Sequence, residues 1–458
     1  MKFKNENELL EFTSAIEGKT FKEIDSKHLF AENSLTRRKG LLGQIVETGC
    51  YGYPLNNNCS ADFEELGIEL KVSGYVKNKN GSLRAKERLS LSKINFNKIV
   101  TETFENSHVL GKCKKMLIIW YEYESGKKAN DFKITHYQLY DMTKDFEIFN
   151  NDFEIIKQKV LDGKAHELSE GDTSYLGACT KAKTSKDRTT QPFSSISPKP
   201  RAYSLKNAYM TGILKEGMDE NKFTTFKSFK PNEFKTVIEY VKSKLNPYFG
   251  KTQVEILEEI TGEIYGENIP KQISKIISNE LIGKDEELPE KNELFAKTSF
   301  IIKNLPLKEN GKPRERMSFK TINLRDFEEK WENSFWKNYF EETTLITICY
   351  KEQNRSKNGY RILSDVKQIT FNDEDLDSFE KTYNQIKLAI ENEDKNLLPT
   401  STNGFKNQLL EIAPKGLKGD DAYNNFFKKD KTKVAFMISK KLLENKLNNQ
   451  YNLLTFKS

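Results

Sequence analysis

The chain has 458 residues, which corresponds to two or three domains of ordinary size. Hydrophobic residues make up 36% and aromatic residues 11%, so the chain can build real cores and wholesale disorder is excluded. Lys and Arg number 74 against 67 Asp and Glu, a formal net charge of +7, so a surface that binds a polyanion must come from local clustering rather than from bulk charge.

The sequence favours a reduced, cytoplasmic protein without a membrane anchor. Its longest strongly apolar stretch, residues 116–121, is far shorter than the roughly 18 residues of a membrane-spanning helix. Residues 1–6 are charged, and no apolar region typical of a signal peptide follows them. The five cysteines form no Cys-x-x-Cys pair, and the four histidines are isolated, which disfavours a disulfide framework and a zinc site.

The first predicted elements, in chain order, alternate between helix and strand. Residues 41–46 are apolar at helical spacing, residues 67–72 alternate as a strand, and Asn80-Gly81 is a strong hairpin signal. Residues 116–121 form a near-continuous apolar run, typical of a strand covered on both faces. Apolar and acidic residues mix over 146–156, which predicts an amphipathic helix. We expect a mixed α/β fold with a central mixed sheet flanked by helices.

A series of landmarks in residues 80–121 recurs in the same order in residues 310–350, which indicates a tandem duplication. We expect a first domain over 1–220, a linker over 221–234 and a second domain over 235–458. Weaker matches extend the repeat upstream, where Gly18-Lys19-Thr20 resembles Gly250-Lys251-Thr252. The paired landmarks are Asn80-Gly81 with Asn310-Gly311, Glu87-Arg88 with Glu315-Arg316, Ile94-Asn95 with Ile322-Asn323, and Asn106-Ser107 with Asn333-Ser334.

The chemistry-bearing pattern is Asp62 followed by Glu69-x-Lys71. Residues two apart in a strand lie on one face, so Glu69 and Lys71 project together, and Asp62 can approach them from the preceding turn. Two carboxylates can hold Mg²⁺, and a neighbouring lysine can neutralise charge on a phosphate. Such a pattern also arises by chance on a solvated strand face. Glu47, on the predicted helix upstream, offers a third carboxylate or is an ordinary exposed glutamate.

Three motifs in order carry a resemblance to a known family: Lys39-Gly40-x-x-Gly43-Gln44-x-x-Glu47, the segment Asp62 to Lys71, and Ser107-His108-Val109-x-x-Lys112. Together they resemble the MutH family of nucleases, in particular its Sau-three-A-type branch of restriction endonucleases that cut GATC. The resemblance implies a restriction-endonuclease-like fold of the PD-(D/E)xK type, present twice through the repeat. It implies Mg²⁺ as cofactor and duplex DNA containing GATC as substrate, cut to leave a 5′-phosphate and a 3′-hydroxyl.

The resemblance also implies roles for individual residues. Glu47, Asp62 and Glu69 would be the acidic metal ligands, with the Leu70 carbonyl as a further oxygen. Lys71 would be the catalytic lysine, and Lys112 a second lysine of the active site. Lys39 would anchor the active site or a phosphate, or be only a cation at a helix start.

Base recognition is expected from a loop after the catalytic sheet. The family carries an Arg-Pro-Lys-like sequence there, whereas residues 177–182 lack the Arg-Pro pair and keep Lys181 beside Thr180. A basic tract follows, which could neutralise DNA phosphates or be only a solvated loop. Tyr203 would lie near the DNA or pack in the core. The further candidate DNA contacts are Lys183, Arg201, Tyr203 and Lys206.

The second repeat has lost the acidic residues. Ile301-x-Lys303 stands where the first repeat has Glu69-x-Lys71, and Ser278 is near the position of Glu47. Glu293 is the nearest acid to the place of Asp62, so we expect this repeat to be catalytically inactive. The second repeat keeps the loop that is expected to recognise bases, because Pro414-Lys415 matches Thr180-Lys181. It would bind a second GATC as an effector, or else only dimerise or cover the first repeat.

Three functions compete on these residues. The first is a type II restriction endonuclease specific for GATC, acting through two chains that meet on the DNA or by sequential cuts. The second is a MutH-type nicking endonuclease of mismatch repair, which the duplication argues against. The third is a DNA-binding protein with a decayed nuclease site, which the complete set of acids and lysines in the first repeat argues against.

Overall fold

The chain folds into two compact units in the computed structural model. The first contains the described residues up to 218 together with Ser299, and the second contains residues 236–282 and 300–449. The predicted linker, 221–234, lies outside the described residues. The structure describes residues 2–32, 40–54, 60–78, 81–124, 126–181, 186–218, 236–266, 268–282, 299–354, 358–416, 419–428 and 433–449.

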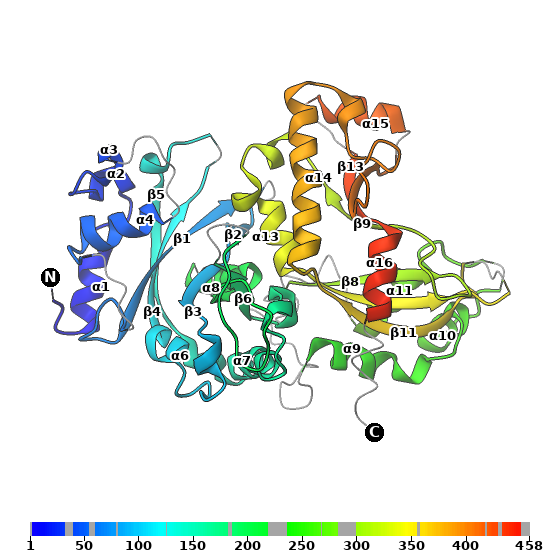
Figure 1. The fold of residues 1–458 in the computed structure, drawn as a ribbon, viewed down its shortest axis with the longest axis horizontal. Helices are drawn as coiled ribbons and strands as arrows, with labels where there is room; N and C mark the ends of the chain where they lie inside the picture. The colour runs from blue at the N-terminus through cyan, green and yellow to red at the C-terminus, as the bar shows by residue number, and fades with distance from the viewer. Residues whose placement is uncertain are drawn as a thin grey trace. The chain divides into compact units, whose positions relative to one another are not determined.

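A four-stranded mixed sheet forms the centre of the first unit (Figure 1). Its order is β2-β1-β4-β5, with β1 (Ile68–Lys77) parallel to β4 (Lys115–Glu122) and the other pairs antiparallel. The outer strands are β2 (Leu83–Ala85) and β5 (Lys133–Asp141). The strand predicted at 116–121 is confirmed as β4, whose middle six residues are all buried. The predicted hairpin joins β1 to β2, with Gly81 at φ +85°.

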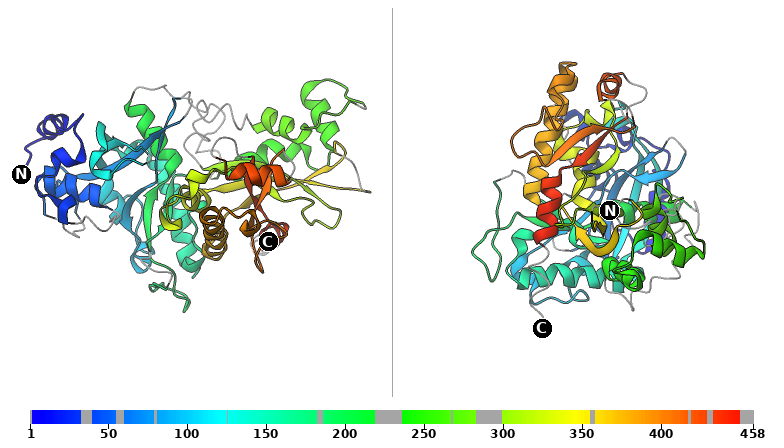
Figure 2. Two further views of the ribbon diagram at one scale, coloured as in Figure 1. Left: turned by 90° about the horizontal axis from the view of Figure 1, so that it is seen from above. Right: turned by 90° about the vertical axis from the view of Figure 1, so that its right-hand side faces the viewer.

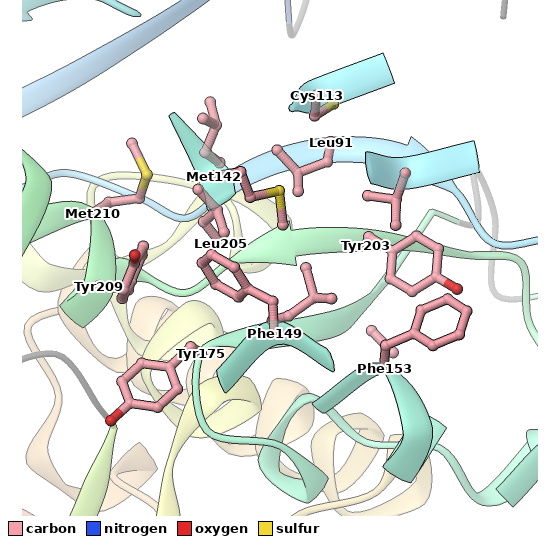
Figure 3. Close-up of a cluster of buried hydrophobic side chains, with 14 of the residues drawn as sticks. Leu91, Cys113, Met142, Phe149, Phe153, Tyr175, Tyr203, Leu205, Tyr209 and Met210 are labelled. Carbon is pink, nitrogen blue, oxygen red and sulfur yellow. The ribbon is translucent and has the colours of Figure 1, made fainter. Parts of the chain in front are cut away.

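A second, antiparallel sheet packs with helices in the same unit. It has the order β3-β7-β6, with β3 (Leu89–Lys93), β6 (Leu176–Thr180) and β7 (Arg201–Leu205). The predicted amphipathic helix is α7 (Phe146–Leu161). Figure 3 shows its Phe149 and Phe153 pointing toward β7. The remaining helices of this region are α5 (Phe96–Ile99), α6 (His108–Cys113) and α8 (Asn207–Gly217).

The N-terminal helices of the first unit build a further core with the central sheet, made by residues such as Phe21, Ile45 and Leu117. The helix predicted at 41–46 is present, but it continues as a π-helix, η1 (Ile45–Cys50), after one α-helical turn, α4 (Leu41–Gln44). The other helices here are α1 (Glu6–Ser14), α2 (Phe21–Ile24) and α3 (Leu29–Glu32).

The second unit also has a mixed sheet and an antiparallel sheet. The first has the order β11-β10-β8, with β8 (Phe300–Leu307) parallel to β10 (Thr344–Lys351). The second has the order β12-β13-β9. The other strands are β9 (Met317–Thr321), β11 (Ile362–Ile369), β12 (Leu410–Pro414) and β13 (Val434–Ile438).

Seven helices described in the second unit accompany these sheets, among which the long α14 is prominent in Figure 1. They are α9 (Val237–Leu245), α10 (Gln253–Thr261), α11 (Ile273–Ile282), α13 (Phe335–Glu342), α14 (Asp373–Glu391), α15 (Gly419–Phe426) and α16 (Lys440–Asn449). Short 3-10 helices of the two units lie at Ala129–Asp131, Met142–Asp145, Ala165–Glu167, Glu170–Asp172, Asn246–Tyr248, Leu324–Phe327, Trp331–Asn333 and Lys395–Leu397.

The architecture confirms the prediction of a mixed α/β protein. Within the described part of the chain, no helix is both long enough and apolar enough to span a bilayer.

Candidate active site

Strand β1 and helix α6 bring together the acid and the lysines that the sequence predicts. Glu69 and Lys71 are two residues apart on β1, so their side chains share a face. Ser107 caps α6 by accepting a hydrogen bond from the backbone N–H of Leu110, which fixes where the helix begins. Lys112 lies in the last turn of α6 and reaches the same carboxylate as Lys71.

The Glu69 carboxylate is the centre of the cluster, and it is 3% exposed. The distance from Lys71 Nζ to Glu69 Oε1 is 2.7 Å, and the distance from Lys112 Nζ to the same oxygen is 3.6 Å. The backbone N–H of Asp62 donates to Glu69 Oε2 at 3.2 Å. In return, the backbone N–H of Leu70 donates to Asp62 Oδ2 at 2.9 Å. These two bonds tie the turn before β1 to the strand and hold Asp62 beside Glu69.

Burial and neighbouring carboxylates raise the pKa values of Glu47 and Glu69. Burial, together with the carboxylates of Asp62 and Glu69, raises the pKa of Glu47 to about 7, against the opposing charges of Lys71 and Lys112. Burial also raises the pKa of Glu69, although both lysines oppose it. For Lys71, burial lowers the pKa, but the adjacent Glu69 carboxylate, together with Cys113 and Asp62, outweighs burial and the net pKa is raised. Lys71 therefore remains a cation, and Glu47 on the π-helix belongs to the same charged group.

The donor set suits a hard divalent cation. Carboxylate oxygens are the protein ligands that Mg²⁺ prefers, and crowded acids with raised pKa values gain from a cation between them. Among the described residues, however, no three acidic, histidine or cysteine side chains are already placed to hold a metal ion. Glu69 is engaged by Lys71, and Asp62 by the Leu70 amide. These side chains would have to turn for a metal ion to bind, and no observation places the Leu70 carbonyl toward it.

The predicted base-reading residues of the first unit lie at the end of β6. Thr180 is the last residue of that strand, and its hydroxyl oxygen is buried without a hydrogen-bond partner among the described residues. Lys181 follows and is exposed, while its backbone N–H donates to the Pro200 carbonyl at 2.7 Å. The two strands that frame the loop are therefore held together at its base. Lys39 and Lys183 lie outside the described residues.

Arg201, Tyr203 and Lys206 are each at most 3% exposed. Arg201 and Lys206 are therefore placed differently from the expectation of a DNA-contacting surface, and Tyr203 takes its alternative place in the core. The Arg201 guanidinium donates to the Ala178 carbonyl at 2.7 Å, and the Lys206 ammonium donates to the Thr173 carbonyl. The Tyr203 ring stacks on Phe153 with centroids 5.9 Å apart, as Figure 3 shows. Their positions favour a role in holding β6 and β7 rather than direct contact with a phosphate.

Strand register aligns two positions of the second unit with Glu69 and Lys71. Glu69 lies opposite Met116, and a β-bulge follows Trp120, four residues after Met116. Ile301 lies opposite Leu345, and a β-bulge follows Cys349, four residues after Leu345. Ile301 thus takes the place of Glu69, and by the same count Lys303 takes that of Lys71. The Lys303 ammonium donates to the Ser318 carbonyl at 2.9 Å.

The other residues of the second unit that the sequence aligns with the site are not acidic where they are described. The Ser278 hydroxyl bonds Asn304 Oδ1 at 2.9 Å and so sits against β8; Glu293 lies outside the described residues. Pro414 ends β12, and the exposed Lys415 donates its backbone N–H to the Lys433 carbonyl at 2.6 Å. That bond repeats the one from Lys181 to Pro200 in the first unit.

The structure adds two residues that the sequence motifs did not include. Asp152 of α7 is 1% exposed and accepts hydrogen bonds from the backbone N–H groups of Ser174, Tyr175 and Leu176, at 2.7 to 2.8 Å. An acid among the apolar positions of an amphipathic helix was the available signal. Cys113, beside Lys112, is fully buried next to Lys71, and burial raises the pKa of its thiol to about 12. No sequence pattern indicated its place in the site.

Comparison with known proteins places these features in context. The family model described as the DNA mismatch repair enzyme MutH matches residues 51–158, which include Asp62, Glu69, Lys71 and Lys112. The chain is 33% identical over 358 residues to the type II restriction enzyme Sau3AI of Staphylococcus aureus, covering 75% of this chain and 72% of that enzyme. It is 26% identical over 222 residues to the DNA mismatch repair protein MutH of Vibrio vulnificus strain YJ016, covering 47% of this chain and 94% of that protein.

Proposed function

Because the chain belongs to the MutH-related family of type II restriction enzymes that includes Sau3AI, we propose that it hydrolyses phosphodiester bonds of duplex DNA at GATC with Mg²⁺. The active site would be the cluster of Glu47, Asp62, Glu69, Lys71 and Lys112 in the first unit. The observation that carries this proposal is the convergence of two lysine ammonium groups on the one buried carboxylate of Glu69.

The chemistry follows from the charges in the cluster. Glu47, Asp62 and Glu69 would hold the metal ion, with Leu70 as a further oxygen donor. When bound, Mg²⁺ supplies Lewis-acid stabilisation of the phosphate and a more acidic water. Release of Glu69 from Lys71 frees the ammonium to face the phosphate oxygens, where it stabilises the negative charge that grows in the transition state. The raised pKa of Lys71 supports this role as a fixed cation rather than as a general base.

We also propose that the two units, 1–220 and 235–458, are copies of one restriction-endonuclease-like domain. Equivalent hydrogen bonds support this. Gly18 donates to the Ile134 carbonyl and Gly250 to the Leu363 carbonyl, and both glycines have positive φ, +83° and +86°. Thr20 and Thr252, two residues later, each begin a helix with the same capping box. The match with MutH covers 47% of the chain, which is about the length of one such copy.

The duplication is supported further by two positions that correspond in the two units, where one interacting pair of side chains is replaced by a different pair. Lys86 lies over the Tyr123 ring at 4.5 Å, and in the second unit Arg314 bonds Glu352. The backbone bonds from Lys86 to Gly74 and from Arg314 to Pro306 support the equivalence of Lys86 and Arg314. The bonds from Tyr123 to Tyr75 and from Glu352 to Leu307 do the same for Tyr123 and Glu352.

The second unit would bind DNA without cutting it. Ile301 in the place of Glu69 leaves that position without a metal ligand, while the exposed Lys415 is kept at the loop. We propose that this unit binds a second GATC as an effector and raises the cleavage rate of the first. The competing role is architectural, in which the unit dimerises or covers the first unit. Two chains meeting on the DNA would cut both strands, since one chain supplies one active site.

The assay that tests the proposed function uses purified full-length protein, Mg²⁺ and unmethylated plasmid with several GATC sites. Sequenced fragment ends should map to GATC on both strands. Nicked circles alone would instead favour the MutH-type nicking enzyme. Specific binding without any cleavage would favour a GATC-binding protein with a decayed site, and the catalytic assignment would then be withdrawn.

A further inference from the structure

The loop between β6 and β7 displays apolar side chains to solvent. Phe193 is 70% exposed and Ile196 is 54% exposed. Among the residues described in the first unit, the only other exposed large apolar side chain is that of Leu161, which is 38% exposed and ends α7. Gly163, two residues after Leu161, approaches Phe193 so closely that an added Cβ would lie 2.6 Å from the Phe193 carbonyl oxygen. All three exposed apolar residues therefore belong to segments that meet at Gly163.

Hydrogen bonds hold the tip of this loop in place. Gln191 is 8% exposed; its Oε1 accepts from the Ala165 backbone N–H at 2.9 Å, and its Nε2 donates to the Ile196 carbonyl at 2.5 Å. These bonds close residues 191–196 into a ring anchored on the segment after α7. Below the ring, the Thr189 N–H donates to the Pro198 carbonyl at 2.9 Å. The loop stands away from the strands of its unit in both views of Figure 2.

The conformation of Phe193 carries a cost that packing within the described chain does not offset. Its φ is +64°, in the left-handed region that is unfavourable for a bulky side chain. Exposing an aromatic ring adds to this cost. A strained backbone that presents an exposed aromatic ring is expected where the ring serves binding.

The surroundings of the ring indicate what it binds. Lys181, Lys186 and Arg188 are exposed on the same loop, with Asp187 as the one acid in its described part. Pro198 is paired with Thr189, and Pro200 with Lys181, so the apolar tip continues directly from the proposed base-reading residues. Positive charge beside an exposed aromatic ring is the combination with which proteins contact phosphates and bases together.

We propose that Phe193 and Ile196 form an apolar wedge that contacts the bases of the bound duplex, while the neighbouring cations contact its phosphates. Phe and Ile are among the side chains that proteins insert between base steps, at the cost of partial unstacking. The wedge would thus contribute affinity that does not depend on counterion release. This inference rests on the proposed function, because it takes GATC-containing duplex DNA as the ligand.

The test compares duplex binding by full-length wild type, Phe193→Ala and Ile196→Ser, without Mg²⁺ and at several salt concentrations. The control is Ile264→Ala, which changes a 91% exposed apolar residue of the second unit. We expect Phe193→Ala to weaken binding about tenfold, within the range for loss of a base–aromatic contact, with an unchanged slope of log K against log salt concentration. Lys186→Ala, at an exposed cation of the same loop, should instead make that slope shallower.

A second variant keeps the test independent of folding. Phe193→Asn suits the left-handed backbone, so its melting temperature should equal or exceed that of wild type while its DNA affinity falls as in Phe193→Ala. Equal affinity of wild type and both variants would overturn the wedge. So would a wild-type oligomer that Phe193→Ala dissociates, because the ring would then serve self-association. If wild type itself fails to bind GATC duplex, the proposed function fails rather than the wedge alone.

Discussion

Glu47 lies on a π-helical turn, close enough to Asp62 and Glu69 for their charges to act on it. Its pKa of about 7 has two consequences of opposite sign. Without metal, the folded state holds the Glu47 proton more tightly than the unfolded state, so stability from this group is present at low pH and is lost as the pH rises from about 4.5 to about 7. Metal binding needs the ionised form, so it is favoured as the pH rises through about 7.

The corresponding prediction concerns Mg²⁺ affinity. From the fraction of Glu47 that is ionised, Mg²⁺ should bind about tenfold more tightly at pH 8 than at pH 6. The measurement is the rise in melting temperature with Mg²⁺ concentration at the two pH values. Glu47→Gln should bind Mg²⁺ more weakly and lose most of this pH dependence. Identical Mg²⁺ titrations of wild type at pH 6 and pH 8 would contradict the assignment.

At the scale of single residues, the sequence was enough to predict those side-chain positions that local backbone geometry determines. Strand alternation was enough to place Glu69 and Lys71 on one face, and the structure puts their side chains in contact. Lys112 could be found only through the resemblance to a family, because helix packing sets its distance from Glu69. The burial of Arg201 and Lys206 was not predicted, whereas packing in the core was one of the two alternatives for Tyr203. They lie on or just after β7, the middle strand of its sheet, where even polar side chains are enclosed.

At the scale of elements, Asp152 connects α7 to the start of β6. Its carboxylate accepts three backbone N–H groups from the segment that leads into β6 and, through that strand, to the loop carrying Lys181. The long helix α14 of the second unit makes a related connection, since the Thr382 hydroxyl donates to the Leu410 carbonyl at 2.7 Å. Each unit therefore ties its long helix to the strand before its proposed reading loop.

We expect Asp152→Asn to destabilise the first unit. An amide has one acceptor oxygen in place of two, so at least one buried N–H loses its partner, at a cost of about 1–3 kcal/mol. The melting transition of the first unit should fall by about 5 °C, and DNA affinity should fall with it because the loop is less well held. Glu154→Gln, an exposed acid of the same helix, is the control. An unchanged melting curve in Asp152→Asn would show that the three bonds do not stabilise the unit.

Most elements were predictable and their ends were less so. The apolar run of β4, the hairpin after β1 and the amphipathic pattern of α7 were all recognised, because each rests on short-range periodicity. The change from α-helix to π-helix at Ile45 was not predicted. Such a turn depends on how the helix packs against the sheet, and it decides the direction in which Glu47 projects.

At the scale of the whole molecule, the proposed effector role of the second unit can be tested through Lys415. Wild type should cut a plasmid with two GATC sites about tenfold faster than a plasmid with one, which is within the usual range of coupling between sites. Lys415→Ala should lower the two-site rate toward the one-site rate and leave the one-site rate unchanged. Lys406→Ala, another exposed lysine of the second unit, is the control. Equal rates on both plasmids with wild type would favour the architectural role.

The proposed function depends above all on Glu69, and one measurement tests it most directly. Glu69→Gln keeps the size of the side chain but removes the charge that binds Lys71 and would hold Mg²⁺. We predict that this variant still binds GATC duplex as wild type does and cuts it at least about 10²-fold more slowly, whereas Glu64→Gln, an exposed acid five residues earlier, cuts normally. Cleavage by Glu69→Gln at the wild-type rate would contradict the placement of the active site in the first unit.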